Sequence, residues 1–505
     1  MKTQKNETSK NKSNTVEKSI SFIGFLKQKE QLYDFAIIFG CCLLGYFVIR
    51  YFYPYPLTFS DSGGYIDAAM KDMFYVYRLF GYSYFLQIIH SITANVHSIF
   101  IIQLFLFLLA TCFLAFTIKY FYAPAKKWLW YFSLLFLIFT PTSFIMANWI
   151  MSDLLFSAQV YFLVVMFIFI IKRKSWIAAI LFILLLFTTL HVRYSAMVFP
   201  FVIIPFLLMI KGMLRWIITV MTVLVFYIFY TQVKTSMKES VKIDQFSTGF
   251  DGWNYANNVL HTLPHIDLKT EKLKSPRLQE LHNFILENID TVKKAINDKP
   301  VITANLMWKN NLPLKKYLFI TMQKQKTPYL TTFVRLGNGL YKDYAIYIMT
   351  HYPFAFLQYY FLPNCKQTFF PAEGCLIAAD HEKPKVMYEY YQIDKKNAMQ
   401  TKSDYLKNPF YHATIKILHL IMWVSLAGIG IAAIAKRKKL GFSRDDKVVF
   451  WGLFSFAVIY YASSIFAAPM EIRYLICMHS IQFVFLYLLL NKLFAINKNQ
   501  NKLTT

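Results

Sequence analysis

The chain has 505 residues, of which 56% are hydrophobic and only 16% are charged. With a mean hydropathy of +0.38, this composition excludes an ordinary soluble domain, in which about a quarter of residues are charged, and indicates a membrane protein. The formal charge of +27 comes largely from Lys and Arg in short loops between apolar runs, so we expect positive-inside orientation and no nucleic-acid partner.

The predicted elements begin with a polar, basic segment over residues 1–32, which lacks the apolar core of a signal peptide and is expected to stay in the cytoplasm. Because a membrane helix needs roughly 20 apolar residues, about ten later runs are candidate spans. They are Tyr33–Tyr53, Ser98–Tyr122, Trp128–Met146, Leu154–Ile171, Trp176–Leu190, Ala196–Ile210, Trp216–Tyr230, Tyr411–Ala435, Val448–Ala467 and Tyr474–Phe494.

These runs divide the chain into a transmembrane module over residues 33–230, with a first outer loop at 54–97, and three closing spans over 410–494. Between them we expect an extracytoplasmic domain of mixed structure at 231–409, and residues 495–505 form a second cytoplasmic tail. Five short basic loops fall on the cytoplasmic side if the N-terminus is inside.

The segment from Tyr344 to Phe361 is interrupted by His351 and Pro353 and is rich in Tyr. A true span here would reverse the orientation of every later loop, so we interpret it as a helix lying in the membrane interface. Cys365 and Cys375 share one polar loop. They form either a disulfide, if that loop is extracytoplasmic, or two free thiols.

Acidic and arginine residues collect in the loops that this orientation places outside. Asp61 opens the sequence DSGGYIDAA, where it is either a helix cap or a general base in an outer cleft. Asp67 is more simply a solvated residue. Arg78 either snorkels at the interface or binds a phosphate through its planar donor fork.

For the polar residues of three further outer loops, a structural role and a role in binding or catalysis are again both open. Ser152 and Asp153 begin a predicted span, where both are good N-caps. His191, Arg193 and Tyr194 end another span, where a snorkelling arginine is the simpler interpretation. Glu471, Arg473 and Tyr474 precede the last span, where a local Glu–Arg pair would explain the charges.

Two acids and three arginines on one side of the membrane together indicate a base and a cradle for a phosphorylated lipid. The spans carry almost no charge at mid-depth, which disfavours an ion-coupled transporter or channel. No Walker loop, dinucleotide fingerprint, zinc spacing or GxSxG elbow is present. The chemistry would therefore use an already activated substrate. No metal-ligand cluster is predicted, although the acids could hold a divalent cation.

The order of these motifs resembles that of the C-type (GT-C) membrane glycosyltransferases, relatives of the protein O-mannosyltransferases and the lipid A aminoarabinose transferase, which use polyprenyl-phosphate sugars. An acidic D-S-x-x-Y loop follows the first span, then an arginine with GY-x-x-FL, then SD-x-x-F, and E-x-RY closes the series. The resemblance covers most of residues 33–494 and is weakest over 231–409. The chain lacks the prolines common beside the arginine, and it has Asp153 where Glu is common.

The resemblance implies roles for individual residues. Asp61 would be the catalytic base and Asp153 the second acid. Arg78, Arg193 and Arg473 would contact the donor phosphate. Asp251 and Trp253 are further candidates for sugar contacts, and the segment around His351 looks like the interfacial helix of the family. The substrate would also be contacted by Ser62, Tyr65, Tyr82, Ser152, His191 and Tyr474.

We therefore expect an all-α polytopic protein of the inner or plasma membrane with about ten or more spans, both termini in the cytoplasm and an extracytoplasmic active site. It would transfer a sugar, with inversion, from a polyprenyl-phosphate donor to a hydroxyl of a lipid, glycan or protein, without a required cofactor. Two alternatives remain open: a lipid-linked glycan polymerase or ligase, and a non-enzymatic transport or assembly protein.

Overall fold

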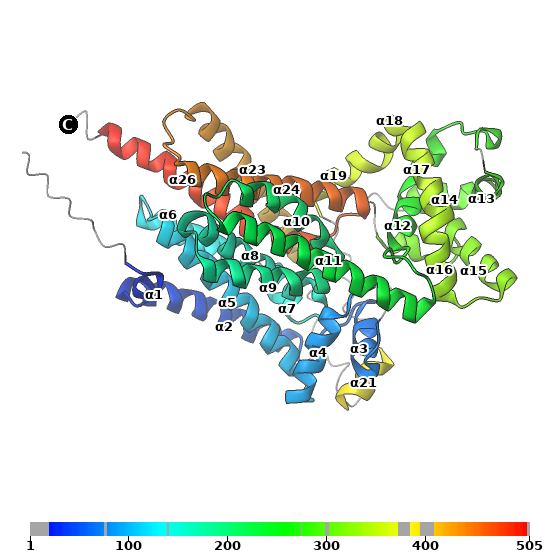
Figure 1. The fold of residues 1–505 in the computed structure, drawn as a ribbon, viewed down its shortest axis with the longest axis horizontal. Coiled ribbons are helices and arrows are strands. Elements are labelled where there is room, and N and C mark those ends of the chain that lie inside the picture. The colour runs from blue at the N-terminus through cyan, green and yellow to red at the C-terminus, as the bar shows by residue number, and fades with distance from the viewer. Residues whose placement is uncertain are drawn as a thin grey trace, which may run out of the picture.

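The computed structural model describes residues 20–74, 78–138, 141–273, 275–297, 302, 304–371, 384–393 and 409–501. Of the residues that the structure describes, 81% are helical and none belongs to a strand, apart from an isolated parallel bridge between Leu57 and Trp149. A long helical bundle makes up one side of the molecule, and a second group of helices lies beyond one end of it (Figure 1).

Within the described residues, eight helical segments are long and apolar enough to cross a membrane. They are α2 (Lys29–Phe52), α5 (His97–Phe121), α6 with α7 (Lys127–Ile138 and Pro141–Ala147), α8 (Ser152–Arg173), α11 (Leu214–Val241), α23 (Pro409–Ala435, apolar from Ile415), α24 (Arg444–Ala467), and α25, η9 and α26 taken together (Ile472–Leu475, Ile476–Met478 and His479–Asn501).

Two other predicted spans form apolar helices that are shorter than the roughly 20 residues typical of a membrane helix. These are α9 (Trp176–Val192) and the continuous pair η1 (Tyr194–Met197) and α10 (Val198–Leu208). The structure thus confirms a multi-pass helical membrane protein and supports eight spans by length and composition. The expected count of ten or more is not confirmed.

The bundle is built around α8. Of the most apolar part of α8, 83% is buried, against 17% for α23 and 28% for α11. α8 packs against α5 on one side and α9 on the other. Because lipid tails are as apolar as Leu, a helix at the rim of the bundle can keep its large side chains on the outside. The hydrophobicity of α8 therefore serves the core, and that of α23 the lipid-facing surface.

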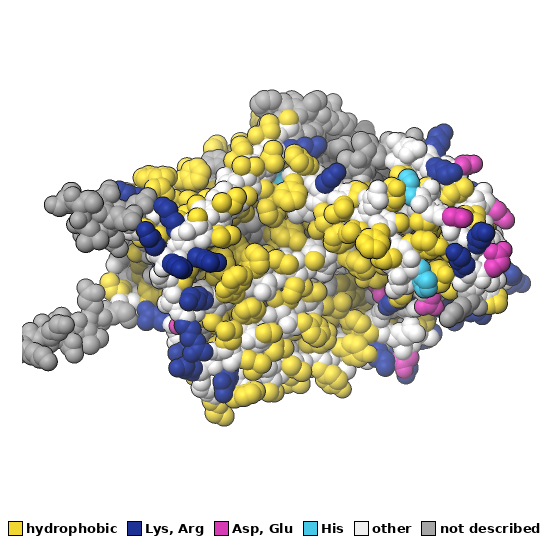
Figure 2. All heavy atoms as spheres, turned by 90° about the horizontal axis from the view of Figure 1, so that it is seen from above, with side chains coloured by type: hydrophobic (Ala, Val, Ile, Leu, Met, Phe, Trp, Pro, Cys, Tyr) yellow, Lys and Arg dark blue, Asp and Glu magenta, His cyan; other side chains and the backbone are white. Residues whose placement is uncertain are grey.

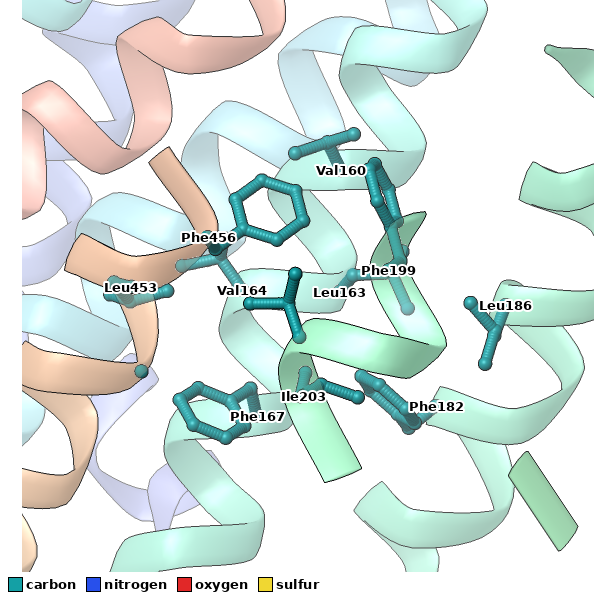
Figure 3. A pocket seen from close by; sticks show the side chains of 12 residues that line it. Val160, Leu163, Val164, Phe167, Phe182, Leu186, Phe199, Ile203, Leu453 and Phe456 are labelled. Carbon is teal, nitrogen blue, oxygen red and sulfur yellow. The ribbon is translucent and has the colours of Figure 1, made fainter. Parts of the chain in front are cut away.

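An apolar crevice lies where α8, α9, α10 and α24 meet (Figure 3). Its volume is about 30 Å³, room for no more than about two water molecules. Gly452 brings α24 close to α8, since a Cβ there would lie 2.8 Å from the Phe167 ring. The crevice is thus a small gap in tight packing rather than a site for a lipid chain.

Buried ion pairs tie the helices together at the end where α8 finishes. Lys119 pairs with the fully buried Asp34, whose Oδ2 also accepts a 2.9 Å hydrogen bond from Trp130 Nε1. Lys172 pairs with Asp446, which also completes a capping box with Ser443 at the start of α24. Such pairs persist in an apolar bundle because each charge has its partner and further hydrogen bonds.

Exposed bases gather at this same end of the bundle (Figure 2). They come from the loops that precede or follow α1 (Phe22–Leu26), α6, α8, α11 and α23, and include Lys27, Lys126, Lys127, Arg173, Lys174, Lys211 and Lys436–Lys439. We call this the basic end. The loops expected in the cytoplasm thus lie together.

The opposite end of the bundle carries two short helices, α3 (Ser62–Lys71) and α4 (Phe80–Ile92), and the second helical group. The described part of that group consists of α12 (Phe250–Val259), η2 (Leu263–His265), η3 (Thr270–Lys272), α13 (Pro276–Glu287), α14 (Ile289–Asn297), η4 (Ala304–Trp308), α15 (Pro313–Gln325), α16 (Tyr329–Leu336), η5 (Gly337–Tyr341), α17 (Lys342–His351), α18 (Pro353–Phe356), η6 (Leu357–Phe361) and α19 (Leu362–Phe369). The short helix α21 (Lys385–Tyr391) packs instead on α3 (Figure 1).

This region differs from the sequence prediction in two respects. It was expected to be mixed, whereas its described residues form helices and no strand. It was also expected to begin at residue 231, but α11 continues as a helix to Val241. The predicted break at Pro353 is present, because α17 ends at His351 and α18 starts two residues later. Cys375, and with it the candidate disulfide, lies outside the described residues.

Candidate active site

Two loops at the end of the bundle opposite the basic end are joined by backbone hydrogen bonds. Leu57 donates to the carbonyl of Asn148 at 2.7 Å, and Ile150 donates to the carbonyl of Leu57 at 3.0 Å. Ser62 Oγ adds a third link, since it donates to Ile150 O at 2.8 Å while accepting from Phe59 N. These links hold the start of α3 beside the start of α8, and so place Asp61 and Asp153 at one location.

Neither acid acts as a helix cap. Asp61 occupies the N-cap position of α3, but its side chain makes no capping bond. Asp153 lies in the first turn of α8, whose N-cap is Met151, also without a side-chain cap. The simpler interpretation of both acids, capping, is therefore not what the side chains do.

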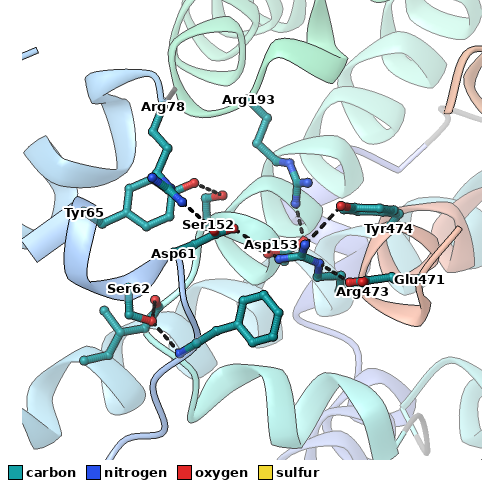
Figure 4. Close-up of polar contacts among 12 residues, drawn as sticks. Asp61, Ser62, Tyr65, Arg78, Ser152, Asp153, Arg193, Glu471, Arg473 and Tyr474 are labelled. Carbon is teal, nitrogen blue, oxygen red and sulfur yellow. Dashed lines mark hydrogen bonds and ion pairs between the residues drawn. The ribbon is translucent and has the colours of Figure 1, made fainter. Parts of the chain in front are cut away.

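Asp61 is held between two arginines that lie far apart in the sequence. Arg78 forms an ion pair with Asp61 Oδ1, and Arg473 Nη1 lies 3.4 Å from Oδ2 (Figure 4). Burial raises the pKa of this carboxyl, but the two guanidinium groups outweigh burial and bring its pKa below the usual range. Asp61 is therefore ionised at neutral pH, the form that a general base requires.

Asp153 pairs with the third arginine. Arg193 follows the last residue of α9 in an extended conformation, which directs its side chain to the buried Asp153. Its guanidinium also lies over the Phe156 ring and over the Tyr474 ring, at 5.5 and 5.3 Å from their centroids. A guanidinium stacked between rings is fixed in orientation as well as paired.

Arg473 connects Asp61 to a third acid. Its Nε lies 2.7 Å from Glu471 Oε2, and its guanidinium stacks on Phe59 and Tyr474. Burial raises the pKa of Glu471 above its ordinary value, Arg473 opposes this effect, and Asp61 and Asp153 add to it. Glu471 and Asp61 thus have pKa values displaced in opposite directions, as in sites that need both an acid and a base.

These groups line one cavity of about 540 Å³, within the range of small-molecule sites. Three arginines and three acids face it, together with aromatic and hydroxyl side chains (Figure 4). The predicted residues in its wall are Asp61, Tyr65, Arg78, Ser152, Asp153, Arg193, Arg473 and Tyr474.

Within the cavity, Tyr65 from α3 and Ser152 from α8 share a hydrogen bond of 3.0 Å between their hydroxyl oxygens. The Arg78 guanidinium lies 5.4 Å from the centre of the Tyr65 ring. The two helix starts that carry the acids are therefore also joined by side chains.

Three predicted contacts lie outside the cavity wall. Ser62 is buried and holds the loop links described above. Tyr82 is fully buried and donates to Gln103 Oε1 at 3.0 Å. The two ring nitrogens of His191 lie 2.7 Å from Phe187 O and from Gln232 Oε1. Because their polar atoms are used within the protein, these three residues support the site rather than line it.

The second helical group closes one side of the cavity, although not through the residues singled out in the sequence. Trp253 is fully buried against Trp308, and Asp251 is hydrogen-bonded to Ser247 and Lys342. The cavity wall instead includes Phe250, Asn254, Met307 and Trp308.

Sequence reasoning missed Asn254 and the 304–308 turn, and it treated Glu471 only as the partner of Arg473. The buried Asn254 Oδ1 accepts no hydrogen bond in the structure, so it is available to a ligand donor. A signal was present in the FDGWNY stretch, where the residue that faces the cavity stands next to the tryptophan that was chosen.

No group of three or more His, Cys, Asp or Glu side chains in the described part of the chain has the arrangement of a metal site. The acids of the cavity are arranged alternately with arginines, and each acid is paired with one. This arrangement suits an anion flanked by carboxylates better than a cation held by them.

The fold and the cavity define a class: a multi-pass helical membrane protein with a charged cavity where its spans meet a second helical group. Comparison with known proteins does not narrow this class, because no protein-family model, curated protein or solved structure matches the chain.

Proposed function

We propose that the protein is a membrane glycosyltransferase that moves a sugar from a polyprenyl-phosphate donor to an acceptor hydroxyl, with inversion. The observation that carries this proposal is the Asp61 carboxylate held between Arg78 and Arg473 in a cavity at the end of a membrane bundle. A lipid-linked donor would reach such a cavity from the bilayer, and its phosphate would meet the arginines.

The proposed reaction is a single displacement. The acceptor oxygen attacks the anomeric carbon and forms the new glycosidic bond, while the bond from that carbon to the phosphate oxygen breaks. Asp61 takes the hydroxyl proton as the attack proceeds. Polyprenyl phosphate leaves with the electron pair, and Arg78, Arg193 and Arg473 stabilise its charge. Because one displacement occurs, the anomeric configuration inverts.

The ion pairs do not prevent phosphate binding. A guanidinium carries five N–H donors in a planar fork, more than a single carboxylate accepts. The same arginine can therefore hold an acid on one edge and a phosphate on another. Asp153 would then orient Arg193, and it would also position the acceptor or the sugar ring.

The orientation belongs to the proposal as well. The basic end would face the cytoplasm together with both termini, and the cavity would open at the outer face of the inner or plasma membrane. The clustering of exposed Lys and Arg at one end favours this orientation.

A second candidate function is favoured by the same contacts. Every arginine of the cavity is paired with an acid of the cavity, an arrangement that would also serve a non-enzymatic transport or assembly protein, in which the network would only hold helix ends together. A glycan polymerase or ligase would share the phosphate cradle but would take a longer lipid-linked glycan.

The test is sugar transfer by the full-length protein in lipid nanodiscs, offered a panel of polyprenyl-phosphate monosaccharides. Wild type should transfer or slowly hydrolyse a donor, and Asp61→Asn should lower that rate by about 10²–10⁴-fold because the proton has no acceptor. The matched control is Asp67→Asn on the same helix, which removes an ion pair with Lys71 outside the cavity.

A folded Asp61→Asn protein with wild-type activity would show that the base lies elsewhere. Equal loss in the Asp67→Asn control would show that α3 had been damaged. A wild-type protein that acts only on lipid-linked oligosaccharides would favour the polymerase or ligase. No activity with any donor, together with unaltered folding of both variants, would favour the non-enzymatic function.

A further inference from the structure

A second cavity, of about 480 Å³, lies between α3–α4 and the far end of α11. Polar side chains supply much of its wall. The lining residues are Ala68, Asp72, Met73, Phe74, Phe80, Ser83, Tyr84, Gln87, Thr231, Gln232, Thr235, Ser236 and Glu239. We call it the polar cleft.

One wall of the polar cleft explains why α11 continues beyond its apolar part. Thr231, Gln232, Thr235, Ser236 and Glu239 recur at helical spacing and form one stripe along the helix. Val233, Met237 and Val241 form a buried stripe on the opposite face of the helix. This stretch is thus an amphipathic extension of a membrane helix. Thr235, Ser236 and Glu239 present hydroxyl and carboxylate groups to the cleft, whereas Gln232 Oε1 is paired with His191 and Thr231 Oγ1 donates to Ile228 O.

The facing wall comes from α4 and the end of α3. Ser83, Tyr84 and Gln87 repeat the same spacing on α4. Gln87 Nε2 donates to Ala69 O at 2.9 Å and to Asp72 Oδ1 at 3.1 Å, which fixes the turn after α3. The Phe80 and Tyr84 rings meet edge to face at 5.5 Å and add an aromatic surface.

The charge of the polar cleft is opposite to what a phosphate needs. Its lining includes the carboxylates Asp72 and Glu239, and none of its lining residues among those described is a Lys or Arg. The neighbouring Lys71 is ion-paired with Asp67, and Lys234 is ion-paired with Asp244. Hydroxyl, amide and carboxylate groups beside aromatic rings suit a hydroxyl-rich ligand that is neutral or cationic.

The cleft lies directly behind the candidate active site. Leu79 lines the charged cavity, and the next residue, Phe80, lines the polar cleft. Gly81 then packs so closely on the end of α9 that a Cβ would lie 2.5 Å from His191 O. The first turn of α4 is therefore the wall between the two cavities, and a ligand that passes this turn would contact both.

We propose that the polar cleft is a carbohydrate-binding site that holds the head group of a neutral or cationic sugar acceptor next to the charged cavity. The acceptor role rests on the proposed glycosyl transfer, whereas carbohydrate binding does not. The division of charge would assign the phosphate-bearing donor to the arginines and the uncharged or cationic acceptor to the cleft.

The first experiment measures carbohydrate binding without turnover. The full-length protein in nanodiscs is titrated with methyl glucoside, glucosamine and glucuronate, and binding is followed by saturation-transfer NMR. We expect the neutral and cationic probes to bind and the anionic probe to bind about tenfold more weakly. Thr235→Val with Ser236→Ala removes two hydroxyls at nearly constant shape and should weaken binding about tenfold. The control pair, Ser240→Ala with Thr350→Val, changes exposed residues outside the cleft.

The outcomes separate this proposal from the enzymatic one. Binding that is lost in the cleft variant and kept in the control supports the carbohydrate site, even if no donor is ever hydrolysed. Equal binding by both variants, or preference for the anionic probe, overturns it. Where donor hydrolysis is detectable, the cleft variant should keep it and lose transfer to added sugar. Loss of hydrolysis as well would make the cleft part of the donor site and overturn the acceptor role.

Discussion

The acids of the charged cavity are defined by the partners that reach them from distant parts of the chain. Arg78 and Arg473 converge on Asp61, and Arg193 reaches Asp153 from the end of α9. The sequence predicted these five residues as a group because they share one side of a membrane with few other charges. It could not predict how they pair, since pairing depends on which helix ends pack together.

The pH dependence of stability should report the environment of Asp61. Its pKa in the folded protein lies below 3.8, the value of an unperturbed Asp. It therefore stabilises the fold above that pH, and the contribution is lost as pH falls through the folded-state pKa. We expect Asp61→Asn to melt at a lower temperature than wild type at neutral pH, and the difference to shrink below pH 3.8.

The melting temperatures of wild type and Asp61→Asn are measured over a range of pH by tryptophan fluorescence in detergent, and Asp67→Asn serves as the reference variant. Glu471 has the opposite dependence, because its raised pKa favours the protonated form and its contribution falls as pH rises through the folded-state value. Because Glu471 is present in both proteins, the difference in melting temperature between Asp61→Asn and wild type reports the contribution of Asp61. A difference that stays constant or grows on acidification would contradict the environment described for Asp61.

At the scale of elements, helix ends were harder to predict than helices. The apolar runs located each span, but the polar stretch after Tyr230 was assigned to the extracytoplasmic domain. It continues the helix, with Val233, Met237 and Val241 buried at helical spacing within it. The role of the α11 extension depends on α4, which forms the facing wall of the polar cleft and cannot be inferred from the sequence of α11 alone. A single polar segment does not indicate the surface that its sparse apolar residues will meet.

The contact between α4 and α9 gives a prediction for this scale. Gly81→Ala would place a methyl group 2.5 Å from backbone that cannot rotate away, so α4 must shift. Overpacking of this kind typically costs about 1–3 kcal/mol, and both cavities should lose their shape. Gly428→Ala on α23 is the control, because a Cβ there meets nothing within 4 Å. Equal melting temperatures for the two variants would contradict the tight packing of α4.

The buried ion pair between Asp34 of α2 and Lys119 of α5 gives a second prediction at the scale of elements. Lys119→Met leaves the Asp34 carboxylate without its counter-charge inside the bundle, which should cost about 3–5 kcal/mol. Adding Asp34→Asn should restore much of the loss, because no uncompensated charge remains. Chemical unfolding of the single and double variants in detergent micelles measures both. A double variant no more stable than Lys119→Met alone would show that the carboxylate is not the cause.

At the scale of the whole molecule, charge and composition predicted a multi-pass helical protein, which the structure confirms. By length and composition the structure supports eight spans, fewer than the expected ten or more, because α9 and α10 are apolar but short. The helical nature of the second group could not be predicted, since its sequence alternates short apolar and polar stretches whose burial depends on neighbouring helices. Its helices pack through glycines, as where Gly249 and Gly337 make a contact that leaves no room for a Cβ on Gly337.

The orientation can be measured directly. In a background without the native cysteines, Lys438→Cys lies at the basic end and Lys269→Cys in the second helical group, both at exposed positions. A membrane-impermeant maleimide applied to intact cells should label only Lys269→Cys, and permeabilised cells should show labelling of both. The reverse pattern would place the charged cavity in the cytoplasm and remove the outer-face reaction from the proposal.

The hydrogen bonds between the loops at Leu57 and Ile150 have a consequence for local motion. Amide protons in loops usually exchange with solvent quickly, because only small openings are needed. Here both bonds join the same two segments, so separation of the segments exposes both amides together. Deuterium uptake at the two amides should be slow and correlated. Asp61 and Asp153 would then belong to one cooperative unit and keep their relative positions for as long as the two segments stay joined.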